Sequence, residues 1–166
     1  MPRPVNAALI SEMLRAHGAA LELFAAQWTA EAEDSVQEAM VELAGQSKAP
    51  DNPRAWLYRV VRNRAMNQAR AARRRAAHEG LAARLRPIGD DVVDTAEIAD
   101  ALASLADDER EVVVMRVWGQ LTWQEIAEVI GKSSSSAERR FQAGLEALKK
   151  IWEIATCPTN TNSPTS

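Results

Sequence analysis

The residues with the most specific chemistry lie between positions 54 and 70, where arginines are interspersed with aromatic and aliphatic side chains. Cations hold phosphates and aromatic rings accept unstacked bases, so this combination is suited to single-stranded DNA. Helical periodicity turns Trp56, Leu57, Val60 and Val61 to one side. The alternative is that Trp56 belongs to the core and that Arg73 to Arg75 form a solvated helix end. The residues predicted on the outward face are Tyr58, Arg59, Arg62, Met66 and Arg70.

A second candidate site lies in residues 121–145, which contain two helix starts separated by one glycine. Thr122 can cap a helix while Glu125 reaches back to the cap amide, with Leu121 and Ile126 as a hydrophobic staple. Gly131 can then end that helix, and a serine run at 133–136 offers the next cap. The pattern predicts a helix-turn-helix, with an ordinary helical hairpin as the alternative.

The second helix of this motif is expected from about residue 137 to residue 152. An apolar stripe at Ala137, Phe141, Leu145 and Leu148 faces inward, which leaves a polar face short enough to enter a major groove. The outward residues are Ser135, Arg139, Gln142 and Glu146.

The sequence offers little for catalysis or metal binding. Cys157 is the single cysteine, and the histidines are His17 and His78, so neither a disulfide within the chain nor a zinc centre is expected. We find no glycine-rich phosphate loop and no nucleophile spaced from a histidine as in known hydrolases. Neither a membrane span nor a secretory signal is apparent, so we expect a cytoplasmic protein that is not an enzyme and needs no cofactor.

Charge is segregated along the chain, although the net charge is only −3. Residues 51–86 carry ten arginines against Asp51 and Glu79, a balance of +8. Residues 87–113 carry nine acidic residues against Arg110, a balance of −8. This arrangement indicates a nucleic-acid face beside a segment that avoids or imitates nucleic acid. The alternative is a pair of solvated faces that partly neutralise each other.

The elements around these candidates are all expected to be helical. Residues 7–29 predict one broken or two short helices, interrupted at His17 and Gly18. Residues 31–45 predict an amphipathic helix whose outward face could dock on a basic partner or could simply be solvated. That outward face consists of Asp34, Gln37, Glu38, Val41 and Glu42.

The connecting segments are predicted from their capping and breaking residues. Asn52 and Pro53 end a polar loop at 46–52 and begin the arginine-bearing helix. An interdomain linker is placed at 80–96, where periodicity fades. A short helix containing Ile98 follows, and Asp107 is expected to cap another whose apolar side chains pack beneath the helix-turn-helix. The tail after Trp152 is expected to be disordered.

Together these segments resemble the extracytoplasmic-function (ECF) class of bacterial RNA polymerase sigma factors. The resemblance rests on residues 32–38, 53–63, 105–111 and 121–127, in that order. It implies an all-α protein with two small helical domains joined by a flexible acidic linker. The implied domains are 1–79 (region 2), the linker 80–96, 97–153 (region 4, with the helix-turn-helix) and a tail at 154–166.

The resemblance also implies partners and site residues. Region 2 would bind core RNA polymerase and open the minus-10 promoter element, and region 4 would read the minus-35 element. An anti-sigma factor remains an open further partner, and the recognition helix has Glu138, Ala143 and Leu145 where members usually carry arginines. The implied core-polymerase set is Asp34, Gln37, Glu38 and Val41. The implied minus-10 set is Tyr58, Arg59, Arg62, Asn63, Asn67 and Arg70. The implied minus-35 set is Ser135, Ser136, Glu138, Arg139, Arg140 and Gln142.

Two other functions remain open at this point. One is a free-standing helix-turn-helix regulator whose N-terminal lobe serves dimerisation or sensing. The other is a helical interaction protein that has lost DNA binding, which would agree with the scarcity of arginines on the recognition helix.

Overall fold

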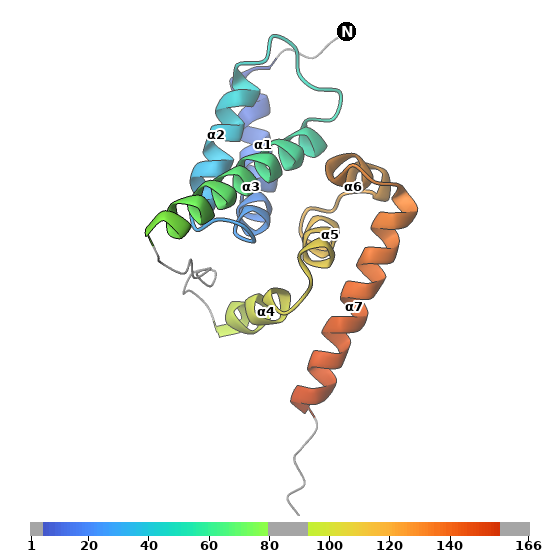
Figure 1. The fold of residues 1–166 in the computed structure, drawn as a ribbon. Coiled ribbons are helices and arrows are strands. Elements are labelled where there is room, and N and C mark those ends of the chain that lie inside the picture. Colours follow the sequence, from blue (N-terminus) through green and yellow to red (C-terminus); the bar gives the residue numbers. More distant parts are fainter. Residues whose placement is uncertain (1–4, 80–92, 157–166) are drawn as a thin grey trace, which may run out of the picture.

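The computed structural model describes residues 5–79 and 93–156, and within these ranges the secondary structure is entirely helical (Figure 1). The all-α prediction is therefore confirmed for the described residues. The helices are α1 (Ala7–Ala25), α2 (Ala32–Ala44), α3 (Pro53–Glu79), α4 (Val93–Ala103), α5 (Asp107–Val117), α6 (Trp123–Ile130) and α7 (Ser134–Thr156).

Helix α1 is continuous, so the predicted break at His17 and Gly18 is wrong. Asn6 caps the helix by accepting a hydrogen bond from the Leu9 amide at 2.9 Å. A glycine costs a helix about 1 kcal/mol relative to alanine, whereas burying one large apolar side chain contributes about 1.5–3 kcal/mol. Leu21 and Phe24 are both fully buried beyond Gly18, so packing outweighs the local preference.

Helices α2 and α3 complete an N-terminal lobe with α1 and largely follow the predicted patterns. Val36, Met40 and Leu43 of α2 are buried, and its acidic face points to solvent. Helix α3 begins at Pro53, and Asn52 Oδ1 accepts from the Ala55 amide at 3.1 Å, as the predicted cap requires.

The C-terminal lobe consists of α4 to α7, and its first elements differ from the prediction. Residues 80–92 of the predicted linker lie outside the described residues, and α4 already begins at Val93 within it. Asp107 is the first residue of α5 rather than its cap, because Ala106 occupies the cap position without a side-chain hydrogen bond. Among the apolar side chains of this segment that were expected to pack beneath the helix-turn-helix, Val117 and Trp118 are instead 48% and 38% exposed.

The helix-turn-helix is confirmed, but its second helix differs from the prediction in its bounds and in one residue of its inward stripe. Thr122 and Glu125 form the predicted capping box, and Gly131 has the left-handed φ of 65°. Helix α7 begins earlier than predicted, at Ser134, and extends to Thr156, into the segment predicted as a disordered tail; residues 157–166 lie outside the described residues.

The inward stripe of α7 contains Gly144 in place of the predicted Leu145. A Cβ on Gly144 would lie 2.8 Å from Val113 Cγ2, so α5 packs directly on this glycine. Leu145 is consequently turned aside and 38% exposed.

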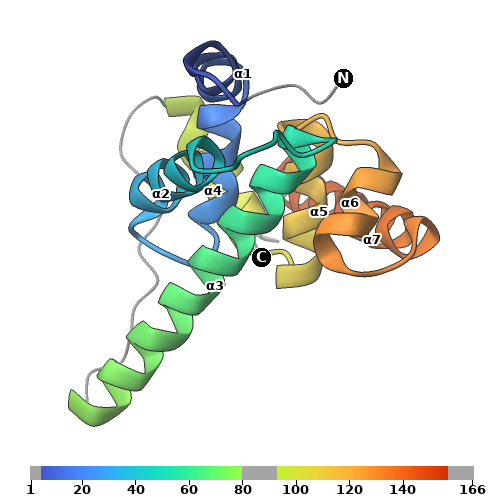
Figure 2. The same ribbon diagram turned by 90° about the horizontal axis from the view of Figure 1, so that it is seen from above.

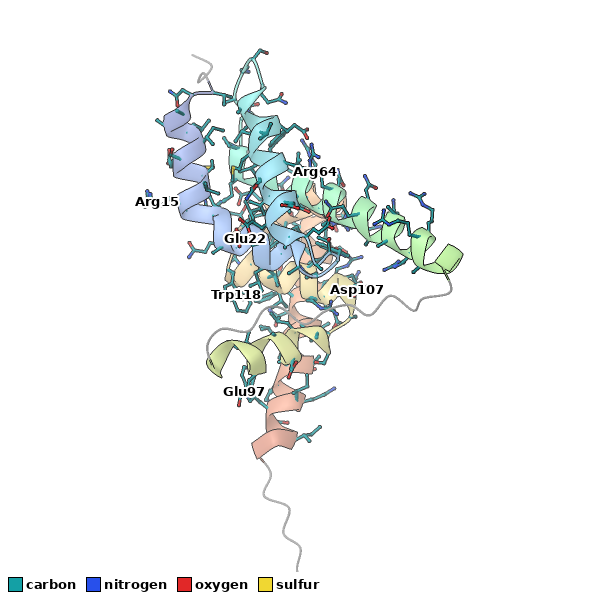
Figure 3. All side chains as sticks on the ribbon, turned by 90° about the vertical axis from the view of Figure 1, so that its left-hand side faces the viewer. Arg15, Glu22, Arg64, Glu97, Asp107 and Trp118 are labelled. Atoms are coloured by element: carbon teal, nitrogen blue, oxygen red, sulfur yellow. The ribbon has the colours of Figure 1, made fainter. Side chains whose placement is uncertain are left out.

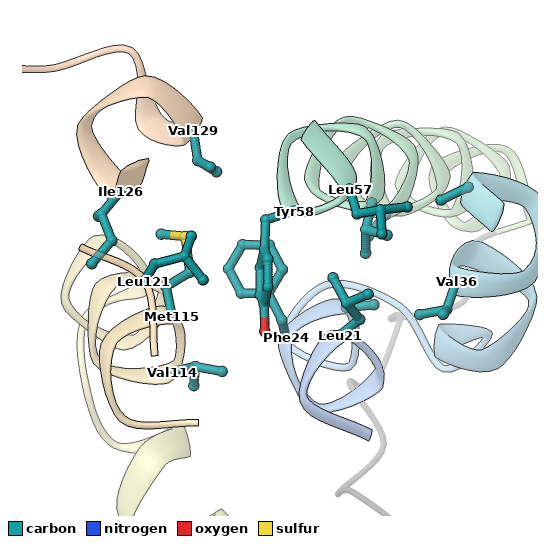
Figure 4. Packing of buried hydrophobic residues seen from close by; sticks show 14 of the residues in the cluster. Leu21, Phe24, Val36, Leu57, Tyr58, Val114, Met115, Leu121, Ile126 and Val129 are labelled. Carbon is teal, nitrogen blue, oxygen red and sulfur yellow. The ribbon is translucent and has the colours of Figure 1, made fainter. Parts of the chain in front are cut away.

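The two lobes pack against each other along α3. Figure 2 shows α3 with α2 on one side and the C-terminal helices α5 and α6 on the other. Buried side chains from both lobes form one hydrophobic cluster, in which Tyr58 and Phe24 meet Met115 and Leu121 (Figure 4).

Candidate nucleic-acid interfaces

The polar residues of α3 form two adjacent rows with opposite environments. Arg54, Tyr58 and Arg62 are spaced four residues apart and face the C-terminal lobe. The neighbouring row is exposed and consists of Arg59, Asn63, Asn67 and Arg70. The predicted minus-10 set is thus divided between a covered and an open row.

Tyr58 is fully buried, so the prediction that it faces outward is wrong. Its ring packs edge-to-face on Phe24, with centroids 5.1 Å apart. On the other side, a Cβ added to Gly119 would lie 2.7 Å from the Tyr58 hydroxyl, so a side chain at residue 119 would collide with it. The hydroxyl has no hydrogen-bond partner, and burial raises the pKa of Tyr58. Local helical periodicity cannot predict this burial, because the burial depends on contact with the C-terminal lobe.

Arg62 is held by a glutamate of α5. Its Nε donates to Glu111 Oε2 at 2.7 Å and its second terminal nitrogen donates to Oε1 at 3.2 Å. Glu111 is 3% exposed, and Arg140 of α7 also lies 3.8 Å from its Oε1. One carboxylate therefore contacts an arginine from the minus-10 set and one from the minus-35 set.

Arg54 is held in the same way by Glu125, the capping-box residue of α6. One terminal nitrogen of Arg54 lies 2.8 Å from both carboxylate oxygens. Asn52 donates to Oε1 at 2.5 Å, and the Thr122 amide donates to Oε2 at 2.7 Å. Burial alone would raise the pKa of Glu125, but the hydrogen bonds from Arg54, Thr122 and Asn52 lower it to about 2.

Beside the Arg62 contact, a cleft of about 260 Å³ separates α3 from the start of α5. Arg70 and Arg73 line one wall, and Asp107 and Asp108 line the other. Asp107 and Asp108 of the C-terminal lobe thus lie opposite Arg70 and Arg73 of α3.

The predicted minus-35 residues are mostly open to solvent. Ser135, Glu138, Arg139 and Gln142 of α7 are exposed, and Ser136 is half-buried. Arg140 is also half-buried, and its Nε lies 3.5 Å from Asp108 Oδ2.

The predicted core-polymerase residues share an exposed face of α2. Asp34, Gln37 and Glu38 are exposed, and Val41 is 71% exposed. Arg64, labelled in Figure 3, joins α3 to this helix by an ion pair of 2.8 Å with Glu38 and a second ion pair with Glu42.

Sequence reasoning missed Arg54, Glu111 and the interdomain contact of Glu125. The four-residue spacing of Arg54, Tyr58 and Arg62 was available as a signal for a shared face. The acidic partners of Arg62 and Arg54 lie 49 and 71 residues away in the chain, respectively, and no local pattern connects them.

Other kinds of site find no support in the described part of the chain. No cluster of three or more His, Cys, Asp or Glu residues there could hold a metal ion. Nor is any helix of that part long and apolar enough to span a membrane.

Comparisons with known proteins define the class. Residues 13–75 match the family model for sigma-70 region 2, and residues 95–148 match the model for sigma-70 region 4. The chain therefore belongs to the sigma-70 family of RNA polymerase sigma factors.

Comparison with individual relatives narrows the class to the ECF sigma factors, to which this chain belongs. It is 31% identical over 161 residues to ECF RNA polymerase sigma factor SigL of Mycobacterium tuberculosis, covering 87% of this chain and 89% of SigL. It is 28% identical over 108 residues to SigK of a Mycobacterium species, covering 59% of this chain and 55% of SigK. It is thus a factor for promoter-specific transcription initiation and not an enzyme.

Solved structures share the fold across both lobes. The sigma factor RpoE of Bartonella quintana, in complex with the anti-sigma factor NepR, has a TM-score of 0.71 at 21% identity, over 89% of this chain and 98% of RpoE. CnrH, in complex with the cytosolic domain of CnrY, has a TM-score of 0.62 at 25% identity, over 90% of each chain.

Proposed function

We propose that this ECF sigma factor binds core RNA polymerase through the exposed face of α2 and brings it to two-part promoters in the cytoplasm. The N-terminal lobe, residues 1–79, recognises and melts the minus-10 element and holds an unstacked non-template base. Within the C-terminal lobe, residues 97–153 read the minus-35 element. Residues 80–96 connect them, and an anti-sigma factor is a candidate further partner, because RpoE was solved with one.

The observation that carries this proposal is the presence of three separate exposed polar faces. The α2 face is acidic and includes the exposed Val41, which suits a basic surface with an apolar spot. The open row of α3 combines Arg59 and Arg70 with two asparagines, which suits a phosphate backbone and base edges. Arg139 of α7 is free to enter a major groove, where its planar fork can bond both acceptors of a guanine.

The α2 assignment is tested by reversing one charge. Asp34→Lys should cost about 2–5 kcal/mol of binding free energy to core polymerase, because it places a cation against a basic surface. The matched control is Glu12→Lys, which reverses an exposed carboxylate on α1. Competition binding to core polymerase measures both, and equal competition by the two variants would remove α2 from the interface.

The promoter role is tested by comparing promoter DNA binding by the protein alone, by core polymerase alone and by both together. A sigma factor should shift promoter DNA specifically only in the presence of core polymerase. Specific binding by the protein alone would favour a free-standing regulator instead. Binding to core polymerase without any promoter preference would favour an interaction protein.

A further inference from the structure

We propose that Arg64 of α3 is a positioning residue for the core-polymerase surface, because its guanidinium holds Glu38 and Glu42 of α2 in one fixed arrangement. The inference rests on the proposed function of the α2 face and deepens it in two ways. It adds Glu42 to the residues that meet the polymerase. It also assigns a role to an arginine that belongs to none of the predicted polymerase or DNA contacts.

The contact joins two helices of the N-terminal lobe through a single side chain. One terminal nitrogen of Arg64 donates to Glu38 Oε2 at 2.8 Å, and the other donates to Glu42 Oε2 at 2.5 Å. Glu38 and Glu42 are four residues apart on α2, so they lie on the same side of this helix, one turn apart. One guanidinium therefore fixes two carboxylates of the same face.

Each of the two glutamates keeps one oxygen for a partner. Arg64 uses Oε2 of both carboxylates, and within the described residues Oε1 of Glu38 and Oε1 of Glu42 accept no hydrogen bond. The side chains of Glu38 and Glu42 are 54% and 40% exposed. The bound pair can thus still accept hydrogen bonds from lysines or arginines of a basic surface.

The arrangement of these two carboxylates would be less defined without Arg64. Like charges four residues apart on a helix are unfavourable, so Glu38 and Glu42 would repel each other. Glutamate also has many rotamers, and each side chain that has to be ordered on binding lowers the affinity. A guanidinium bound to both side chains offsets the repulsion and orders them before the polymerase arrives.

Stabilisation of the fold is the alternative role for Arg64, and its geometry supports that role poorly. Its Nε atom is buried without a hydrogen-bond partner, and a buried unsatisfied donor opposes folding. Both glutamates are open to water, and ion pairs with exposed partners contribute little to stability. The contact is therefore better suited to fixing the surface, whereas buried residues such as Val36 and Leu43 pack α2 into the core.

Charge and positioning predict effects on different rate constants when Arg64 is replaced. Loss of a cation makes this side of the lobe more negative, which should speed association with a basic surface. Loss of order in Glu38 and Glu42 should instead speed dissociation, because contacts made by loosely held side chains are weaker. Separate measurement of the two rate constants therefore distinguishes positioning from charge.

The test measures binding of the full chain to immobilised core polymerase by surface plasmon resonance. Arg64→Lys keeps the charge but replaces the planar fork by a single nitrogen, and Arg64→Gln removes both. The matched control is Arg74→Gln, which removes an exposed arginine nearer the C-terminal end of the same helix. Thermal melting followed by circular dichroism checks that each variant is folded.

Both Arg64 variants should dissociate from core polymerase about 3- to 10-fold faster than the parent, as expected when one or two side chains lose their order. Arg74→Gln should dissociate at the rate of the parent. Any faster association should appear in the two glutamine variants and be absent from Arg64→Lys. Folded Arg64→Lys that dissociates as slowly as the parent would overturn the proposal.

A double-mutant cycle tests whether Arg64 acts through Glu38. Glu38→Gln removes this ion pair, so adding Arg64→Lys to it should change the dissociation rate less than Arg64→Lys does alone. Independent effects of the two changes would also overturn the positioning role. Failure of the proposed function is read separately, because Asp34→Lys would then compete for core polymerase as well as the control Glu12→Lys does.

Discussion

Helices α3 and α7 both carry arginines, and one arginine of α3 is bound by its own chain while one of α7 is open to solvent. On α3, Arg62 lies against a glutamate that is 3% exposed, whereas Arg139 of α7 is exposed. The residue type is the same in both helices. The difference arises because α5 and α6 cover one row of α3, and α7 packs its opposite stripe on α5.

This comparison also explains the segregation of charge along the sequence. Part of the basic block becomes α3, and the end of the acidic block becomes α5, which lies across from it. The acidic segment therefore faces the basic one within a single chain.

The largest difference between α3 and α7 is expected in the free energy of unfolding when each helix loses one arginine. Arg62→Ala leaves Glu111 buried with only the longer contact to Arg140, which should cost about 3–5 kcal/mol of unfolding free energy. Arg139→Ala, on the open face, should change the unfolding free energy by no more than about 0.5 kcal/mol. Urea titrations followed by circular dichroism measure both, and equal midpoints would contradict the contrast.

The contact between Arg54 of the covered row and Glu125 should also weaken in acid. The pKa of Glu125 is lowered from 4.5 to about 2, so its stabilisation is complete above pH 4.5 and is lost as the pH falls towards 2. A shift of this size corresponds to about 3 kcal/mol of unfolding free energy at neutral pH. The control is Glu125→Gln, which cannot titrate. The difference in unfolding free energy between parent and variant should shrink over this pH range, and a constant difference would refute the assignment.

A smaller contrast is expected within α7 itself. Arg139→Ala should cost about 1–3 kcal/mol on the preferred promoter and relax discrimination at one minus-35 position. Arg140 lies 3.5 Å from Asp108. Its replacement by alanine should weaken transcription from all promoter sequences alike. Transcription from a randomised minus-35 library measures both variants. If Arg139→Ala scales every promoter by one factor, it does not read a base.

Signals contained within a few residues predicted the local structure well. The capping box of Thr122 and Glu125, the Asn52 cap and the left-handed Gly131 each depend on neighbours three or four positions away, and all are present. The exposed face of α2 followed in the same way, because a one-sided apolar stripe fixes which side of a helix is buried.

Features that depend on distant contacts could not be predicted from those signals. Tyr58 is buried because the C-terminal lobe, including the backbone of Gly119, packs against it. Gly144 replaced Leu145 in the stripe of α7 because α5 approaches it closely. Glu125 was recognised as a helix cap, but its second contact, to Arg54, depends on how the two lobes meet.

The most direct test of the covered row uses Tyr58, which is the single tyrosine of the chain. Tetranitromethane nitrates accessible tyrosines, and mass spectrometry of the intact protein follows the reaction without any label. The folded parent should be nitrated far more slowly than the urea-unfolded chain, and Arg54→Gln should accelerate nitration while Arg64→Gln should not. Nitration of the folded parent as fast as that of the unfolded chain would contradict the covered position of Tyr58 and, with it, the packing of the C-terminal lobe on α3.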